Sequence, residues 1–223
     1  PDGDYLALAD YNNGAYLLDL TFPNVPRWLL TLTYQNLPAA DVTSRDTMGI
    51  CSYLNNGIKS FDLSGSQLYY LETGIGSGPV YYYNNYIYVC RGDSGMTIAD
   101  CAAPDTMYIV NTQSSPGHPF KVAVKNDIAY VANMEKGLSV VDISDPYNPY
   151  EIESLYTGVW AKDVLIHPDS AYLYIIDFFT GLNTFSLTEP RHPRLLSTVA
   201  THPDTGGHDL LFRNGYLYAS NYN

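Results

Sequence analysis

Three aspartates carry the chemistry that the sequence suggests most directly, because each stands directly before an apolar residue in a comparable segment. They are Asp41, Asp163 and Asp209, and Lys121 holds the same place in a further segment. Three carboxylates around one opening could bind Ca²⁺ through their oxygens, helped by main-chain carbonyls. Alternatively, each aspartate caps the turn that leads into its strand, and Lys121 neutralises a neighbouring carboxylate. The sequence leaves both interpretations open and suggests no cofactor besides Ca²⁺.

Two histidines are close to these acids in the sequence. His208 adjoins Asp209, and His202 precedes them in the same predicted loop. With Asp163, they could supply the acid and the base of a hydrolase or lyase. The alternative is a loop whose polar groups are satisfied by turn contacts. The sequence contains no serine nucleophile elbow, zinc-protease helix, EF-hand loop or phosphate-binding loop, so it identifies no catalytic residue.

A predicted hairpin tip carries Arg91, Gly92 and Asp93, a tripeptide that is adhesive in matrix proteins. The same residues are also ordinary turn formers, so both interpretations stay open. Cys90 and Cys101 flank this tip and could form a cross-strand disulfide, which would imply an oxidising compartment. The third cysteine, Cys51, falls where other repeats have apolar residues, and it is predicted to be a small buried core residue.

These candidate residues are positioned by a repeated unit. A ten-residue block ending in glycine recurs without gaps. Its complete copies are Tyr5–Gly14, Met48–Gly57, Tyr86–Gly95, Ile128–Gly137 and Tyr172–Gly181, and a shorter copy starts at Tyr216. The block starts are 38 to 44 residues apart, which is the period of a four-stranded propeller blade. Each block predicts a strand, a tight turn and the start of a second strand.

The rest of each repeat predicts two further strands and the reversals between them. Five residues after each glycine stands a short polar residue that is expected to cap a reversal. These residues are Asp19, Asp62, Asp100, Asp142 and Ser186. The innermost strands are predicted around Val42, Val80, Val122, Val164 and Leu210. The acidic loop residues Asp10, Asp93, Glu135 and Asp177 are expected to form a solvated rim that attracts cations loosely.

The sequence therefore predicts an all-β fold, a β-propeller of four-stranded antiparallel blades, in a single domain over residues 1–223. The repeats run at about 1–44, 45–82, 83–124, 125–168 and 169–212, with a partial repeat at 213–223. Because the chain begins in a turn and ends in a strand, we expect it to be incomplete at both ends. Five to six blades are represented, and six or more are expected in the whole protein. In this fold the candidate site residues would lie at the channel mouth.

The repeated unit also resembles a known family. Gly137–Pro149 (GLSVVDISDPYNP), preceded by Ile128–Ala132, is similar to the repeats of LVIVD-repeat β-propellers, and Gly14–Pro26 and Gly181–Pro193 are weaker copies. The resemblance implies a propeller of the secreted or surface-associated type. It implies no catalytic residues. The second and third repeats depart from the pattern because they lack its paired prolines.

Composition limits the partners. The 11 basic and 23 acidic residues give a formal charge of −12, which repels phosphate backbones and anionic lipid. No apolar run is long enough for membrane insertion. Exposed members of the 22 tyrosines would suit carbohydrate stacking or protein contact. The leading hypothesis is a non-catalytic extracellular or cell-surface binding or structural module, which binds protein or glycan or assembles with itself into a filament or surface layer.

Overall fold

The computed structural model describes residues 5–32, 38–45, 48–54, 56–62, 66–103, 105–113, 117–169, 171–200 and 206–222. By its internal contacts the chain divides into two compact units, Pro1–Thr112 and Gln113–Asn223. The all-β prediction is confirmed, because the described residues form antiparallel sheets and their only helix is the 3₁₀ turn Gly92–Ser94. Within those residues, no helix has the length and apolar character needed to cross a membrane. The extent of a single domain over residues 1–223 stays a prediction.

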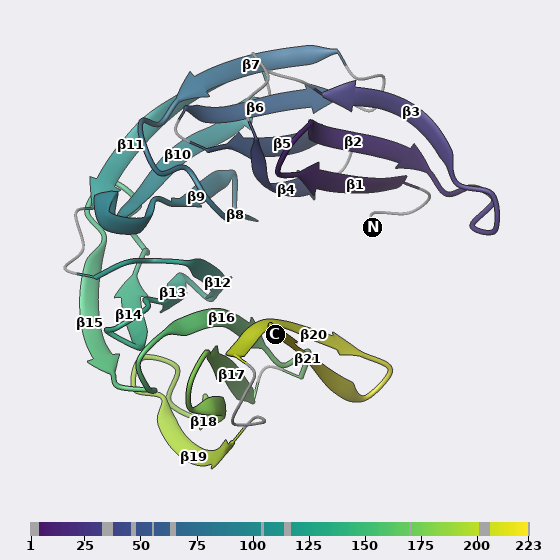
Figure 1. Ribbon diagram of the computed structural model, residues 1–223. Coiled ribbons are helices and arrows are strands. Elements are labelled where there is room, and N and C mark those ends of the chain that lie inside the picture. Colours follow the sequence, from purple (N-terminus) through teal and green to yellow (C-terminus); the bar gives the residue numbers. More distant parts are fainter. Residues whose placement is uncertain are drawn as a thin grey trace. The chain divides into compact units, whose positions relative to one another are not determined.

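The described part of the first unit contains three sheets, whose strands are labelled in Figure 1. The first sheet has three strands, β1 (Tyr5–Asp10), β2 (Gly14–Asp19) and β3 (Arg27–Leu32). The second has four, β4 (Ala39–Arg45), β5 (Met48–Tyr53), β6 (Gly57–Asp62) and β7 (Gln67–Glu72). The third also has four, β8 (Val80–Tyr83), β9 (Tyr86–Cys90), β10 (Met96–Ala103) and β11 (Thr106–Gln113).

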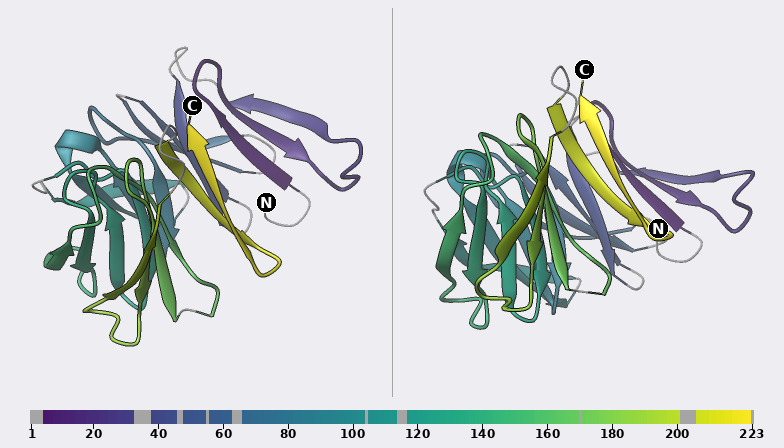
Figure 2. Two further views of the ribbon diagram at one scale, coloured as in Figure 1. Left: turned by 60° about the horizontal axis from the view of Figure 1, so that its bottom comes forward. Right: turned by 90° about the horizontal axis from the view of Figure 1, so that it is seen from below.

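The described part of the second unit likewise contains three sheets. The first has strands β12 (Lys121–Lys125), β13 (Ile128–Ala132), β14 (Leu138–Asp142) and β15 (Tyr150–Leu155). The second has β16 (Ala161–Ile166), β17 (Tyr172–Asp177), β18 (Gly181–Ser186) and β19 (Arg194–Val199). The third is the hairpin β20 (Gly206–Arg213) and β21 (Tyr216–Tyr222). In Figures 1 and 2 this yellow hairpin lies beside β16 and β17, which β20 contacts.

The predicted strand order is confirmed. Strands that follow each other in the sequence pair with each other in every sheet, and four of the sheets have four strands. The predicted innermost positions all fall in the first strand of a sheet, namely β4, β8, β12, β16 and β20. The repeated glycine stands at the start of the second strand of its hairpin or directly before it, and Gly137 shows the steric reason. Its φ is +83°, and a Cβ there would lie 2.4 Å from the Leu155 carbonyl oxygen.

The core consists of side chains that fill the space between neighbouring sheets. In the second unit, apolar residues of β13 and β14 pack with those of β16, β17 and β18. Leu138, Val140, Leu173 and Ile175 are fully buried there. A single four-stranded sheet cannot cover both of its own faces, so burial between sheets stabilises the fold at about 25 cal/mol per Å² of apolar surface.

The repeated polar residues cap the reversals as predicted. The Asp142 Oδ1 accepts the main-chain N–H and the hydroxyl of Ser144, at 2.9 and 2.6 Å. The Asp19 Oδ1 accepts the equivalent pair from Thr21, at 2.8 and 2.6 Å. Main-chain N–H groups also donate to the corresponding side chains of Asp62, Asp100 and Ser186. The sequence pattern therefore predicted the local role of these five repeated residues correctly.

The cysteine predictions have different outcomes. Cys51 is fully buried as predicted, and burial raises the pKa of its thiol to about 12, so the thiol stays protonated. The disulfide prediction is wrong, because neither Cys90 nor Cys101 is in a disulfide. Cys90 pairs with Met96 at one end of the β9–β10 ladder, whereas the Cys101 N–H donates to Asn85 O beyond the other end. The two sulfur atoms therefore lie too far apart to bond.

Candidate functional site

Asp163 joins two innermost strands of the second unit. Its side chain is buried, with the residue 4% exposed. Oδ1 accepts the N–H of Val164, and Oδ2 accepts the N–H of Leu210 on β20, both at 2.7 Å. The pKa of Asp163 is raised to about 6. Burial is the main cause and the Asp209 charge adds to it, whereas Lys121 and the two main-chain hydrogen bonds oppose the shift. The carboxylate therefore connects β16 to β20.

Asp41 does the same in the first unit. Its Oδ1 accepts the N–H of Val42 at 2.8 Å, and its Oδ2 accepts the N–H of Val80 on β8 at 3.1 Å. Asp41 and Asp163 each follow a register shift in their strand, which turns the carboxylate toward the next sheet. Asp163 does more than cap the turn that leads into its own strand, because its Oδ2 accepts an N–H from another innermost strand.

The other candidates of the predicted channel mouth lie near Asp163 in the second unit. Asp209 has a side chain that is 63% exposed, and its Oδ2 lies 3.3 Å from the Nδ1 of His208. Lys121 acts on the Asp163 carboxylate electrostatically. His202 lies outside the described residues. Among the described residues, no group of three or more histidine, cysteine or acidic side chains could hold a metal ion. Asp41 belongs to the other unit, and the Ca²⁺ site stays a prediction.

The adhesive interpretation of Arg91, Gly92 and Asp93 gains no support from the structure, in which the arginine turns inward. Its guanidinium donates to Thr97 Oγ1 at 3.0 Å and to the Ile75 carbonyl oxygen at 3.3 Å, and burial lowers the pKa of Arg91. The adhesive interpretation therefore stays a prediction.

Comparison of the repeats could have revealed this inward orientation. Asn133 occupies the position of Arg91 one repeat later, and it bonds inward to the equivalent of Thr97, which is Ser139, at 2.9 Å. A large polar residue at this position therefore points into the sheet.

Asp177 is the acid that organises the strongest candidate site, although the sequence placed it in a solvated rim. The structure corrects that expectation, because Asp177 is 0% exposed. Its Oδ1 accepts the N–H groups of Phe179 and Thr180, and its Oδ2 accepts the N–H of Trp160, all at 2.9 Å. One carboxylate thus fixes the β17–β18 turn and the segment that leads into β16.

A cluster of aromatic rings lies at these two segments and the residue before β12, and we call it the aromatic surface. It consists of Phe120, Trp160, Phe178 and Phe179, together with Lys162. The ring centroids of Trp160 lie 5.7 Å from those of Phe178 and 5.3 Å from those of Phe179. Phe179 is 58% exposed, whereas the other rings are half-buried. The arrangement leaves one large apolar side chain available on a rigid base.

Lys162 gives this surface its charge. Its Nζ lies 4.3 Å from the centroid of Phe120 and 5.3 Å from that of Trp160, which is cation–π geometry. Burial lowers the pKa of Lys162, and Glu135 opposes the shift. The predicted site residue His208 adjoins the surface, with its ring 6.3 Å from that of Phe120. The surface can therefore combine ring stacking with hydrogen bonding to a ligand.

Sequence reasoning missed the aromatic surface, although a signal existed. Phe179 stands where the earlier repeats have polar turn residues, namely Asn12, Asn55, Asp93 and Glu135. The other repeats have polar residues at this hairpin tip. An aromatic side chain exposed to water at the same position is unfavourable, so it indicates a surface that contacts a ligand or partner.

Comparison with known proteins agrees with this architecture. Residues 78–112 and 116–157 match the LVIVD repeat family. Among curated proteins, no sequence matches the chain.

Several solved structures are similar in fold. A functionally unknown protein from Desulfotomaculum acetoxidans has a TM-score of 0.78 at 14% identity, covering 90% of this chain and 67% of its own. The Cps50 β-propeller domain of Myceliophteria thermophila has a TM-score of 0.77 at 13% identity, covering 99% and 77%. A 6-phosphogluconolactonase, described as putative, from Bacteroides fragilis has a TM-score of 0.78 at 13% identity, covering 98% and 75%. At these identities the similarity concerns the fold alone, and the predicted β-propeller fold of about five to six blades is confirmed.

Proposed function

We propose that this chain, a β-propeller that carries LVIVD repeats, is a non-catalytic binding module whose ligand contacts the aromatic surface of the second unit. The observation that carries the proposal is the buried Asp177, which fixes both segments of that surface through three main-chain hydrogen bonds. A surface that is already ordered loses little conformational entropy when it binds.

The exposed side chains suit such a contact. Phe179 is 58% exposed, and Tyr156 and Val159, in the segment before Trp160, are 72% and 44% exposed. Covering an aromatic side chain contributes about 2 kcal/mol. Lys162 adds a donor beside the rings.

The partner in this proposal is a glycan or another protein, and a second copy of the chain is included. Sugar rings stack on aromatic faces, and protein interfaces favour the same side chains. An extracellular or cell-surface location belongs to the proposal as well. It rests on the resemblance to LVIVD-repeat propellers, and Cys90 and Cys101, which form no disulfide, give it no support.

The hydrolase or lyase alternative gains no specific support. It assigned an acid–base role to Asp163, whose two oxygens both accept main-chain N–H groups. A carboxylate that is used in this way is poorly placed to exchange protons with a substrate.

The test combines a glycan array with sedimentation velocity over a range of protein concentrations. We expect a saturable glycan signal or self-association in the unmodified chain, and at least a tenfold loss in Phe179→Ser. Phe22→Ser is the matched control, because Phe22 is 74% exposed in the first unit. The proposal fails if neither assay gives a signal, or if both variants behave alike.

A further inference from the structure

The short segment Trp160–Lys162 is joined through its main chain to two turns of the second unit. The carbonyl oxygen of Trp160 accepts the N–H of Phe178, in the β17–β18 turn, at 2.8 Å. The N–H of Ala161 donates to the carbonyl oxygen of Met134, in the connection between β13 and β14, at 3.1 Å. The side chains that the segment and the two turns carry are therefore held close together.

These side chains combine an exposed ring with a charged donor and a charged acceptor. Phe179, in the β17–β18 turn, is 58% exposed, and its ring centroid lies 5.3 Å from that of Trp160. The Lys162 Nζ also lies 5.3 Å from the Trp160 centroid. Glu135, which is exposed in the β13–β14 turn, acts on Lys162 electrostatically. An exposed ring and an ammonium group therefore converge on Trp160, and a carboxylate balances the ammonium group.

This combination matches the chemistry of a sugar without charge. A pyranose has one face of C–H groups, which packs on an aromatic ring, and a rim of hydroxyls that both donate and accept hydrogen bonds. An ammonium group donates to one hydroxyl oxygen, and a nearby carboxylate accepts from the next hydroxyl. Because Glu135 already balances the charge of Lys162, the ligand needs no charge of its own.

We infer, as an extension that rests on the proposed function, that the ligand of the aromatic surface is a neutral glycan. One pyranose ring stacks on Phe179, and its hydroxyls bond to Lys162 and Glu135. The formal charge of −12 disfavours an acidic glycan, because like charges repel. A protein partner fits less well. A standard interface buries about 800 Å² on each partner, of which a single aromatic side chain supplies about 200 Å².

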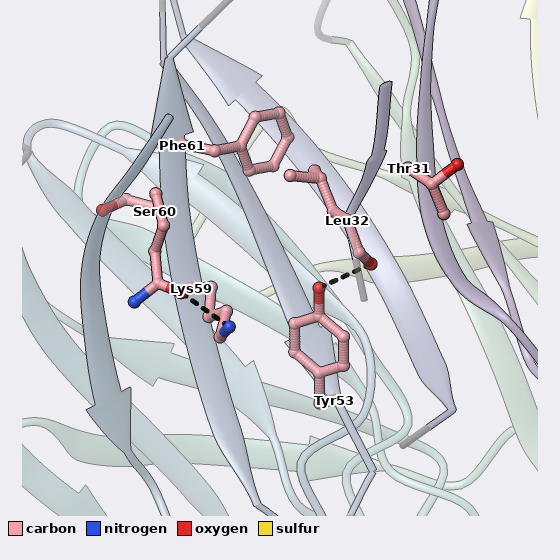
Figure 3. A pocket seen from close by; sticks show the side chains of 7 residues that line it. Thr31, Leu32, Tyr53, Lys59, Ser60 and Phe61 are labelled. Carbon is pink, nitrogen blue, oxygen red and sulfur yellow. Dashed lines mark hydrogen bonds between the residues drawn. The ribbon is translucent and has the colours of Figure 1, made fainter. Parts of the chain in front are cut away.

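Lys59 in the first unit provides a matched control for Lys162. Its Nζ lies 5.9 Å from the centroid of the Tyr53 ring, and burial lowers its pKa as it lowers that of Lys162. Lys59 lines a cavity of about 170 Å³, where the Tyr53 hydroxyl donates to the Leu32 carbonyl oxygen at 3.1 Å (Figure 3). Tyr53 is 0% exposed. The same lysine–ring contact therefore occurs here against a buried ring, on which a sugar cannot stack.

The first experiment compares neutral with acidic sugars. An array carries tetrasaccharides of glucose, galactose, mannose and N-acetylglucosamine, with tetragalacturonate and tetraglucuronate as the acidic set. We expect saturable binding of at least one neutral tetrasaccharide, and at least threefold weaker binding of the acidic set. A smaller difference would overturn this inference and leave the proposed function standing, as would self-association without any glycan signal. The absence of both glycan binding and self-association would overturn both.

The second experiment titrates variants with the strongest neutral tetrasaccharide by calorimetry. Phe179→Leu keeps an apolar side chain but removes the flat ring, and Lys162→Met removes the ammonium group. We expect at least a tenfold loss of affinity in each, and a smaller loss in Lys162→Arg, which keeps a donor. Lys59→Met should bind as the unmodified chain does, and melting curves check that every variant is folded. Unchanged affinity in Phe179→Leu or Lys162→Met would overturn the inference, as would an equal loss in Lys59→Met.

Discussion

The turns built on Asp10 and Asp177 occupy equivalent positions in two repeats, yet the second carboxylate oxygen of each aspartate binds a different part of the chain. In both turns, Oδ1 accepts the N–H groups two and three residues ahead. In the first unit, Oδ2 of Asp10 then accepts the side-chain amide of Asn13, within the same turn, at 3.0 Å. In the second unit, Oδ2 of Asp177 reaches the main chain of Trp160 instead. The same local motif is therefore self-contained in one repeat and fastens a neighbouring segment in the other.

The reversals at Asp19 and Asp142 repeat this contrast. Oδ2 of Asp19 pairs with Arg27 at 3.2 Å, and the aspartate side chain is 19% exposed. Oδ2 of Asp142 pairs with Arg191 of the next sheet at 2.6 Å, and the aspartate side chain is only 7% exposed. An acid that an adjacent sheet covers contributes more, because less water replaces its lost hydrogen bonds. The comparison predicts an order of effects among variants.

The largest effect is expected for Asp177→Ala. Removing the carboxylate leaves three N–H groups without their acceptor in a fully buried site, so we expect the free energy of unfolding to fall by about 4 kcal/mol. Urea denaturation measures this loss, and Trp160 fluorescence in a Trp28→Phe background reports the aromatic surface. A loss below about 1 kcal/mol would show that the hydrogen bond from Trp160 to Oδ2 of Asp177 adds no stability.

Because of Asp163, the stability of the folded chain should fall as the pH rises, which is opposite to the usual effect of an aspartate. Its pKa is raised from 3.8 to about 6, so the folded chain binds the extra proton in this window. Its contribution to stability is fully present below about pH 4 and is lost as the pH rises through 6, by up to about 3 kcal/mol. The stability difference between the unmodified chain and Asp163→Asn, measured by denaturation from pH 4 to 7.5, should change across this interval. A constant difference would contradict the raised pKa.

Asp142→Ala should cost about 2 kcal/mol near neutral pH, because it removes bonds from Ser144, Tyr150 and Arg191. Hydrogen bonds from Ser144 are the main reason why the pKa of Asp142 is lowered. The stabilisation is therefore present above the ordinary value of 3.8 and is lost as the pH falls below it, opposite in sign to Asp163. Asp19→Ala is the paired control in a melting experiment. An equal drop in melting temperature in both variants would contradict the idea that coverage by the neighbouring sheet strengthens the hydrogen bonds of Asp142.

The smallest effect is expected for Asp10→Ala. Its hydrogen bonds stay within one partly exposed turn, where water can replace the lost acceptor. The shift in melting temperature should be less than a third of that caused by Asp177→Ala. Comparable shifts for the two variants would mean that coverage by a neighbouring segment does not decide the strength of this motif.

Much of the local structure followed from the sequence. The block ending in Gly137 specified a hairpin, and Asp142 specified the reversal after it, because such turns depend on residues only a few positions apart. The innermost strands were also predicted, as the positions of Val80 and Leu210 show. The failures concern side-chain direction. The adhesive interpretation of Arg91 requires an outward side chain, whereas Arg91 turns inward, and the Cys90 and Cys101 thiols lie toward opposite ends of their ladder.

By itself, the sequence determined the order of strands and turns and the repeated fold, since period and alternation are properties of neighbouring residues. Only the tertiary structure decided which repeated acids are covered, which one holds Trp160 beside Phe179, and where Lys59 meets a cavity. Each of these depends on contacts between sheets, and no pattern within one repeat specifies what the next sheet places against it.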